Sequence, residues 1–164
     1  MFIYLQNKLS TNSQSAAGTT TTTTTAVLDL VDEYCFSRHW MMHMGPDKRQ
    51  TLDDALQLIP HWDDGSTQHV LILELGSYCG YSTSYLAQAL ARRDARNRGC
   101  VAPPSSTASS LSSSSSSSRV ISVEPDQRAV KWTRRLVEMC GLTSYCTVRI
   151  LFFALPSFYD VSAS

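Results

Sequence analysis

The sequence has no excess of charge of either sign, and this argues against the partners that strongly charged proteins bind. Its 164 residues include 14 basic (Lys and Arg) and 14 acidic (Asp and Glu) side chains, so the formal net charge is zero. Nucleic acids and charged membrane surfaces attract proteins through net charge or through runs of like charge. We therefore expect neither of them as a partner.

Long apolar runs and paired cysteine motifs are also missing. The apolar part of Met1–Leu9 is too short for a secretory signal core or a membrane-spanning helix. The five cysteines are Cys35, Cys79, Cys100, Cys140 and Cys146. Their odd number and the lack of a C-x-x-C pair favour free thiols in a reducing compartment, so we expect a cytoplasmic protein. A mitochondrial presequence is the alternative, although Lys8 is the only basic residue of Met1–Leu9.

At the centre of the chain, a strand-like run leads directly into a glycine turn and a helix start. Val70–Leu75 is apolar apart from Glu74, as expected of a parallel strand covered on both faces. Gly76 and Gly80 allow a tight turn close to a ligand, and Ser82–Ser84 offer hydroxyl and N–H groups to an anion. The pattern predicts a nucleotide-type cofactor site, in which Glu74 accepts hydrogen bonds from the cofactor.

The spacing of these glycines differs from that of dinucleotide-binding folds. Such folds use G-x-G-x-x-G, and here Tyr78 stands where the second glycine would be. A nicotinamide-linked dehydrogenase is therefore disfavoured. A tight turn with a purely structural role is the other interpretation of the same residues.

A second carboxylate, Glu124, supports the cofactor interpretation. It closes the β-branched run Val120–Val123, at the position where an acidic residue holds ribose hydroxyls in βαβ units. The interval from Gly80 is about twice the roughly 20 residues of such a unit. Arg93–Ser118, however, is an insertion rich in proline and serine, and looping it out restores the usual spacing.

The remaining periodic segments complete a predicted α/β fold. The predicted helices are Ala26–Trp40, a segment that opens at Thr51 and stops at Pro60, Ser82–Arg92 and Gln127–Cys140, and the predicted third strand is Cys146–Phe152. We expect a Rossmann-like parallel sheet with flanking helices, truncated after about three strands. Residues 1–25 are predicted to be a disordered low-complexity tail, and Arg93–Ser118 a disordered loop.

Two groups of basic residues are predicted to be solvated surface charges. One is the pair Lys48 and Arg49, which follows the Gly45-Pro46 break. The other is a group of four arginines at the end of the central helix, Arg92, Arg93, Arg96 and Arg98, which suits the negative end of a helix dipole.

Three segments together give a specific resemblance. Glu74–Ser82 (ELGSYCGYS) is preceded by Tyr34–Leu56 and followed by Ile121–Leu142. In this order the three segments resemble the catechol O-methyltransferase family of S-adenosylmethionine-dependent enzymes, over roughly half of the chain. The resemblance implies that residues 26–164 are part of a methyltransferase domain. It also implies methyl transfer from S-adenosylmethionine to a hydroxyl of a small catechol, with Mg²⁺ as the metal.

The resemblance also implies the residues of the site. Cofactor-binding roles fall on Met42, Met44, Glu74, Gly76, Tyr78, Tyr81, Ser82 and Glu124, and a substrate-binding role falls on Trp40. Within that set, Glu124 holds the ribose, Met42 and Met44 lie beside the methyl donor, and Trp40 walls the substrate mouth. The alternative for the methionine-rich stretch is a helix end that packs on the core. His39 and His43 have a zinc-compatible spacing, but no H-E-x-x-H motif is present, so zinc is not expected.

No catalytic residue and no metal ligand is assigned. A phenol of pKa ~10 needs a divalent cation and a base before it attacks a methyl group at neutral pH. The resemblance places the family's metal ligands and catalytic lysine beyond Ser164, and Asp63, Asp64, Asp126 and Asp160 show no clustering in the sequence. We therefore expect weak cofactor binding and no turnover of catechol by this chain. The alternative is a non-catalytic binding module or pseudo-enzyme, which associates with a partner or a second copy through the open sheet edge at Cys146–Phe152.

Overall fold

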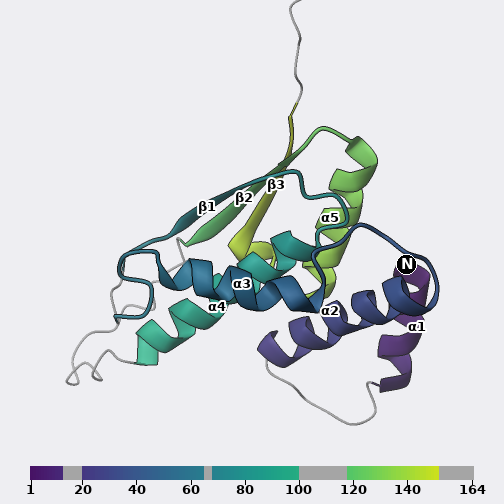
Figure 1. Ribbon diagram of the computed structural model, residues 1–164, viewed down its shortest axis with the longest axis horizontal. Coiled ribbons are helices and arrows are strands. Elements are labelled where there is room, and N and C mark those ends of the chain that lie inside the picture. Colours follow the sequence, from purple (N-terminus) through teal and green to yellow (C-terminus); the bar gives the residue numbers. More distant parts are fainter. Residues whose placement is uncertain (13–19, 65–67, 100–117, 152–164) are drawn as a thin grey trace, which may run out of the picture.

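A three-stranded parallel sheet lies at the centre of the fold (Figure 1). The computed structural model describes residues 1–12, 20–64, 68–99 and 118–151. The strands are β1 (Leu71–Leu75), β2 (Arg119–Glu124) and β3 (Cys146–Ile150), in the order β1-β2-β3. The helices are α1 (Phe2–Asn12), α2 (Thr20–Ser37), α3 (Gly45–Gln57), α4 (Tyr81–Gly99) and α5 (Gln127–Met139), and Thr143–Tyr145 is a short 3₁₀ turn. The predicted α/β class, with a parallel sheet and flanking helices, is confirmed.

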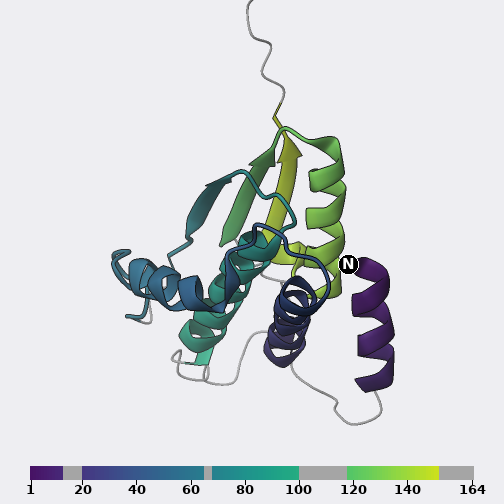
Figure 2. The ribbon, with the colours of Figure 1, turned by 45° about the vertical axis from the view of Figure 1, so that its right-hand side comes forward.

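The crossover helices α4 and α5 lie against one face of the sheet (Figures 1 and 2). The predicted stripe of α5 is buried there: Ala129, Val130, Thr133, Leu136 and Val137, followed by Cys140. Asp126 caps this helix, because its side chain accepts a hydrogen bond from the Arg128 N–H at 2.8 Å. Leu86 and Leu90 of α4 are buried as well, so the core lies between these helices and the sheet.

The opposite face of the sheet is open among the described residues, which corrects the prediction of a strand covered on both faces. Leu71, Leu73 and Leu75 of β1 are 68%, 64% and 75% exposed. The register sets Leu73 beside Ile121 and Leu75 beside Val123, so the apolar surface continues onto β2. The apolar run of β1 is real, but only Ile72 and Glu74 face the helices, because side chains alternate along a strand.

Two stretches of the predicted disordered tail, residues 2–12 and 20–25, are helical, which corrects that prediction for them. Leu5 of α1 is fully buried, and the ring centroids of Tyr4 and Tyr34 lie 5.4 Å apart. The helix α2 begins at Thr20, inside the threonine run, and the last two threonines of the run bond to other elements. The Thr24 hydroxyl, for example, donates to the Cys140 carbonyl oxygen at 3.0 Å. Residues 13–19 lie outside the described part of the chain.

Two further predicted boundaries differ from the structure. The helix α3 begins at Gly45, with Pro46 in its first turn, so the Thr51–Asp54 pattern lies inside the helix and does not start it. The helix α4 continues to Gly99, so Arg93 is not part of a loop. Residues 100–117 of the predicted insertion, and residues 152–164 after the third strand, fall outside the described ranges.

Arg93 is buried, contrary to the prediction of a solvated helix end. Its side chain is 1% exposed and its guanidinium donates to the carbonyl oxygens of Trp62 at 3.0 Å and His61 at 3.2 Å. These bonds fix the segment after α3 against α4. No helix in the described part of the chain has both the length and the apolar character needed to cross a bilayer.

Buried thiol groups make the fold sensitive to high pH. Burial raises the pKa of the Cys35 thiol to about 11, and that of the Cys140 and Cys146 thiols to about 12, from 9.0. In the unfolded chain these thiols ionise near pH 9. Their contribution to stability is therefore complete below pH 9 and decreases as the pH rises from 9 towards 12. We expect the free energy of unfolding in urea, measured under reducing conditions, to fall across that window.

Cys140→Ala supplies the comparison for this pH effect, because it removes one of the most strongly shifted thiols. Its unfolding free energy should fall less steeply between pH 9 and pH 11 than that of the natural chain. Equal slopes would contradict the assignment of the alkaline loss to buried thiols.

Candidate functional site

The turn from Gly76 to Gly80 connects β1 to α4 at the carboxyl ends of the strands, where open α/β sheets bind ligands. The Gly76 N–H donates to the Val123 carbonyl oxygen at 2.8 Å, and the Gly80 N–H closes the turn on the Ser77 carbonyl oxygen at 2.8 Å. Between the glycines, Tyr78 has a φ of 49°, which non-glycine residues rarely adopt. Such backbone strain tends to occur at ligand sites and persists where neighbours impose it.

Thr133 of α5 holds this turn from behind. Its hydroxyl lies 2.9 Å from the Ser77 hydroxyl and 3.3 Å from the Tyr78 carbonyl oxygen. Gly80 lies against the same residue: a Cβ at Gly80 would lie 2.7 Å from the Thr133 Cα. A side chain at Gly80 would therefore push the turn away from α5.

Glu124, at the end of β2, closes the other side of the turn. Its carboxylate accepts hydrogen bonds from the N–H groups of Tyr78, at 2.9 Å, and Asp126, at 3.1 Å. The residue is only 8% exposed, so these bonds fix its orientation. A carboxylate has about four acceptor positions, and two remain for a ligand.

Glu74 lies among hydroxyl groups. It accepts hydrogen bonds from Ser82 at 2.5 Å, from Ser122 at 2.6 Å and from Thr83. The structure therefore brings together two predicted site residues, Glu74 and Ser82, but it joins them directly to each other. The Ser82 hydroxyl keeps its oxygen lone pairs, and the first N–H groups of a helix such as α4 have no partner within the helix itself.

The loop that joins α2 to α3 carries the other predicted residues. Trp40 and Met42 are 77% and 73% exposed, and Met44 is partly buried. Between the two methionines, the His43 ring contacts the ring of Tyr81 edge-on, with centroids 5.1 Å apart. This contact brings the loop to the first residue of α4.

Tyr81 is placed differently from the other predicted cofactor residues. Its side chain is 1% exposed, and its hydroxyl donates to Asp32 at 2.7 Å and accepts from Arg49 at 2.7 Å. Burial and the bond to Asp32 raise the pKa of this hydroxyl, which therefore keeps its proton. The side chain is thus directed at Asp32 and Arg49, and the cofactor role expected for Tyr81 stays a prediction.

Sequence reasoning missed Arg49 and Asp32. Arg49 was expected on the surface, yet its side chain is 17% exposed and its guanidinium pairs with Asp32 at 2.5 Å and Asp29 at 3.0 Å. Its partners come from α2 and α4, so no local pattern in the sequence marked it. Asp32 is buried as well, but the apolar periodicity of its predicted helix did not include it, so no sequence signal marked this residue either.

The described residues contain no group of three or more His, Cys, Asp or Glu side chains that could hold a metal ion. Asp63 pairs with Arg96 at 2.5 Å and Asp126 caps α5, so both have local partners. His43 bonds to Asp32 at 2.7 Å, and His39 is exposed. Asp160 lies outside the described residues.

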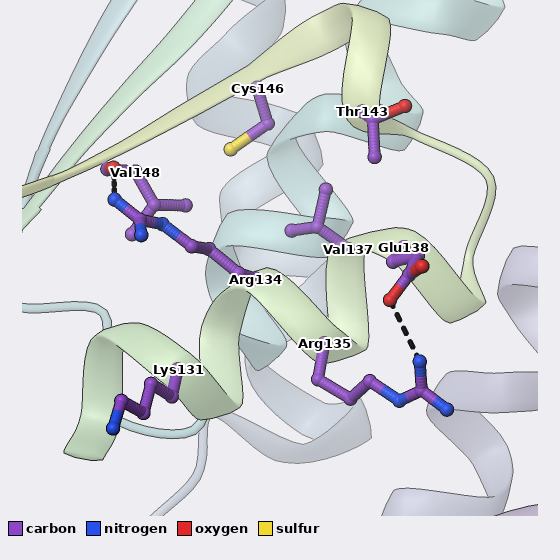
Figure 3. Close-up of a pocket in the computed structure, with 8 residues that line it drawn as sticks. All are labelled: Lys131, Arg134, Arg135, Val137, Glu138, Thr143, Cys146 and Val148. Carbon is purple, nitrogen blue, oxygen red and sulfur yellow. Dashed lines mark hydrogen bonds and ion pairs between the residues drawn. The ribbon is translucent and has the colours of Figure 1, made fainter.

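A hollow of about 540 Å³ between α5 and β3 lies apart from this site (Figure 3). Its lining residues are Lys131, Arg134, Arg135, Val137, Glu138, Thr143, Cys146 and Val148. None of the predicted site residues is among them. Two of its arginines are already paired, Arg134 with the Val148 carbonyl oxygen and Arg135 with Glu138, each at 2.9 Å.

Comparison with known proteins gives relatives of one kind. Catechol O-methyltransferase of Bos taurus is 29% identical over 125 residues, which cover 75% of this chain and 34% of that protein. Catechol O-methyltransferase B of Danio rerio is 36% identical over 66 residues, which cover 40% of this chain and 22% of that protein. Transmembrane O-methyltransferase of Homo sapiens is 27% identical over 73% of this chain and 30% of its own. The chain thus spans about a third of the length of the curated relatives it matches, and no family model matches it.

Solved structures of low similarity carry the same class of name. A Klebsiella pneumoniae protein assigned as an O-methyltransferase has a TM-score of 0.45 at 19% identity, over 85% of this chain and 46% of that one. An O-methyltransferase of Bacillus cereus, solved in complex with S-adenosylhomocysteine, has a TM-score of 0.33 at 19% identity, over 73% and 49%. Over three quarters of its length, this chain is a sequence relative of O-methyltransferases of the catechol O-methyltransferase family, as its motifs predicted.

Proposed function

We propose that the chain binds S-adenosylmethionine at the β1–α4 turn and supplies this site to an O-methyltransferase that acts on a hydroxyl of a catechol-type diol. One observation supports this most directly. Two carboxylates, Glu74 and Glu124, end adjacent parallel strands on either side of the turn from Gly76 to Gly80, which a non-glycine residue holds in a strained conformation.

The residues present fit this cofactor. S-adenosylmethionine carries a positive sulfonium and an ammonium group, which suit a site with two carboxylates and the half-exposed ring of Tyr78. Its carboxylate suits the start of α4, and its ribose hydroxyls suit the two acceptor positions left on Glu124. A Cβ placed on Gly76 would meet nothing within 4 Å, so there is open space beside the turn.

The cofactor supplies the reaction's electrophilic methyl group, and this chain's residues bind and orient it. Glu124 would hold the ribose, the helix start would hold the carboxylate, and Met42 and Met44 would lie beside the methyl donor. For Mg²⁺ the described residues offer no fitting ligand group, so no step is derived through a metal. The expectation that the 164-residue chain does not turn over catechol stays a prediction. Transfer of labelled methyl to catechol by the chain would contradict it.

The test of the binding site is Gly76→Ala, because the added methyl group would enter the space assigned to the cofactor. Isothermal titration with S-adenosylhomocysteine should show one saturable site on the natural chain and at least a tenfold weaker one on the variant. The φ of Gly76 is +87°, so the variant should also lose about 1–2 kcal/mol of stability. No binding to the natural chain would refute the proposed function. Equal affinities of the natural chain and the variant would show that the cofactor does not bind beside this turn.

The second candidate function is a binding module whose sheet a partner or a second copy completes. The exposed leucines of β1 favour it, because edge strands with apolar faces promote association. The sequence predicted such association at the other edge, at β3, and that edge remains a proposal as well. Size-exclusion chromatography with light scattering tests self-association, and a monomer at all concentrations would count against the second-copy form.

A further inference from the structure

Three side chains from three other segments, His43, Arg49 and Tyr81, meet at the carboxylate of Asp32. His43 Nε2 lies 2.7 Å from Asp32 Oδ1, and Arg49 Nη2 and Tyr81 Oη lie 2.5 Å and 2.7 Å from Oδ2. A bond of 2.7 Å from Arg49 Nε to Tyr81 Oη closes the group on itself. Asp32 belongs to α2, His43 to the loop with the methionines, Arg49 to α3 and Tyr81 to the start of α4.

The group is withdrawn from solvent. The side chains of His43, Asp32 and Arg49 are 8%, 11% and 17% exposed. Removing charges from water is unfavourable unless every member is paired, and each member here is. Such a network contributes little net stability compared with apolar packing, but it defines one arrangement of the segments it joins.

The His43 ring has a polar partner at each of its two nitrogens. Nε2 faces the Asp32 carboxylate, and Nδ1 faces the carbonyl oxygen of Met41 at 3.1 Å. Both of these partners are oxygen atoms, so the ring connects the Asp32 carboxylate of α2 to the backbone of the loop. The Arg49 guanidinium pairs with two carboxylates, Asp29 and Asp32, so His43 and Arg49 reach the same aspartate from two separate segments.

We propose that Asp32 is a positioning residue, which through His43, Arg49 and Tyr81 locks the Met42–Met44 loop onto the start of α4. This inference rests on the proposed function, because the loop and the helix start form two sides of the cofactor site. Tyr81 directly precedes Ser82, and His43 lies between the two methionines. The Asp32 carboxylate thereby fixes the loop, which would lie beside the methyl donor, relative to the start of α4, which would hold the cofactor's own carboxylate.

The test is Asp32→Asn, with His43→Gln as a second variant that alters a partly buried loop residue and leaves the core intact. In Asp32→Asn, the amide NH₂ group would replace an acceptor oxygen. It would then face Arg49 or Tyr81, which are themselves donors to this position. In the second variant, glutamine replaces a ring that contacts Tyr81 edge-on and reaches both Asp32 and the Met41 carbonyl oxygen from its two nitrogens. We expect each variant to bind S-adenosylhomocysteine at least tenfold more weakly by calorimetry.

Glu33→Gln is the matched control for both variants. It removes a carboxylate in the same way one residue along α2, where Glu33 pairs with Lys8 at the surface. Its affinity for S-adenosylhomocysteine should stay within twofold of that of the natural chain.

Methionine methyl signals give a readout that a role in stability alone would not move. In protein labelled with ¹³C-methyl methionine, the signals of Met42 and Met44 should shift in Asp32→Asn and His43→Gln, and that of Met139 in α5 should not. If the natural chain fails to bind the cofactor analogue, the proposed function fails, and these shifts in the free protein still decide the locking of the loop. Unchanged loop signals, or natural affinity in both variants, would overturn the inference.

Discussion

Gly80→Ala is expected to lower the free energy of unfolding by about 2–5 kcal/mol, which combines a left-handed backbone of about 1–2 with overpacking of about 1–3. The φ of Gly80 is +85°, and its added methyl group would lie 2.7 Å from the Thr133 Cα, which is backbone and cannot rotate away. Typical domains are stable by only about 5–15 kcal/mol, so the variant loses a large part of the total. Urea unfolding followed by far-ultraviolet circular dichroism measures the loss.

Gly76→Ala is the matched comparison, since the two glycines have nearly the same φ and differ in their surroundings. Gly76 has only the backbone contribution, because its added methyl group meets no atom within 4 Å. The difference between the two variants therefore measures the contact of the turn with α5. Equal losses would show that Thr133 yields, and the turn would not depend on α5 for its position.

Glu124→Gln is expected to weaken binding of S-adenosylhomocysteine by about 10–100-fold, because hydrogen bonds to charged groups contribute about 1.5–3 kcal/mol each. The carboxylate accepts from the N–H groups of Tyr78 and Asp126 in the structure. In the variant the amide nitrogen would face one of these donors, so the turn loses a bond and the ribose loses an acceptor. Isothermal titration at one salt concentration measures the change.

Glu138→Gln is the control for that experiment. Glu138 lies on the exposed side of α5 and pairs with Arg135, with a side chain 61% exposed. Its replacement makes the same chemical change away from the turn, so binding should stay within twofold. A similar loss in both variants would mean that overall charge, and not the position of Glu124, governs affinity.

The sequence predicted the elements whose signals are local. The apolar run before Gly76, interrupted only by Glu74, located β1, and the spacing of the α5 stripe located a helix that starts at Gln127 as expected. The positions of Glu74 and Glu124 at strand ends followed from the same reasoning. Their hydrogen bonds did not, because the hydroxyl partners of Glu74 and the N–H partners of Glu124 come mostly from other elements.

The errors concern residues whose environment is set by distant parts of the chain. Threonine is a poor helix former, so the run before Ala26 gave no helical signal. Its helix is supported by bonds such as that from Gln88 to Thr25 at 3.0 Å, across two helices. Arg49 and Arg93 are charged and were assigned to the surface, yet their acceptors lie 17 and 31 residues away. Composition describes such residues correctly on average and fails where the fold supplies a buried acceptor.

The exposed row of Leu71, Leu73 and Leu75 also bears on how long the chain lasts in a cell. Apolar strands at a sheet edge are the surfaces that chaperones hold and that aggregation uses. Chains whose leucine row stays uncovered would be bound by chaperones and degraded by proteases. If the proposed partner or second copy covers the row, the steady-state amount of the chain would follow the supply of that cover more closely than its own rate of synthesis.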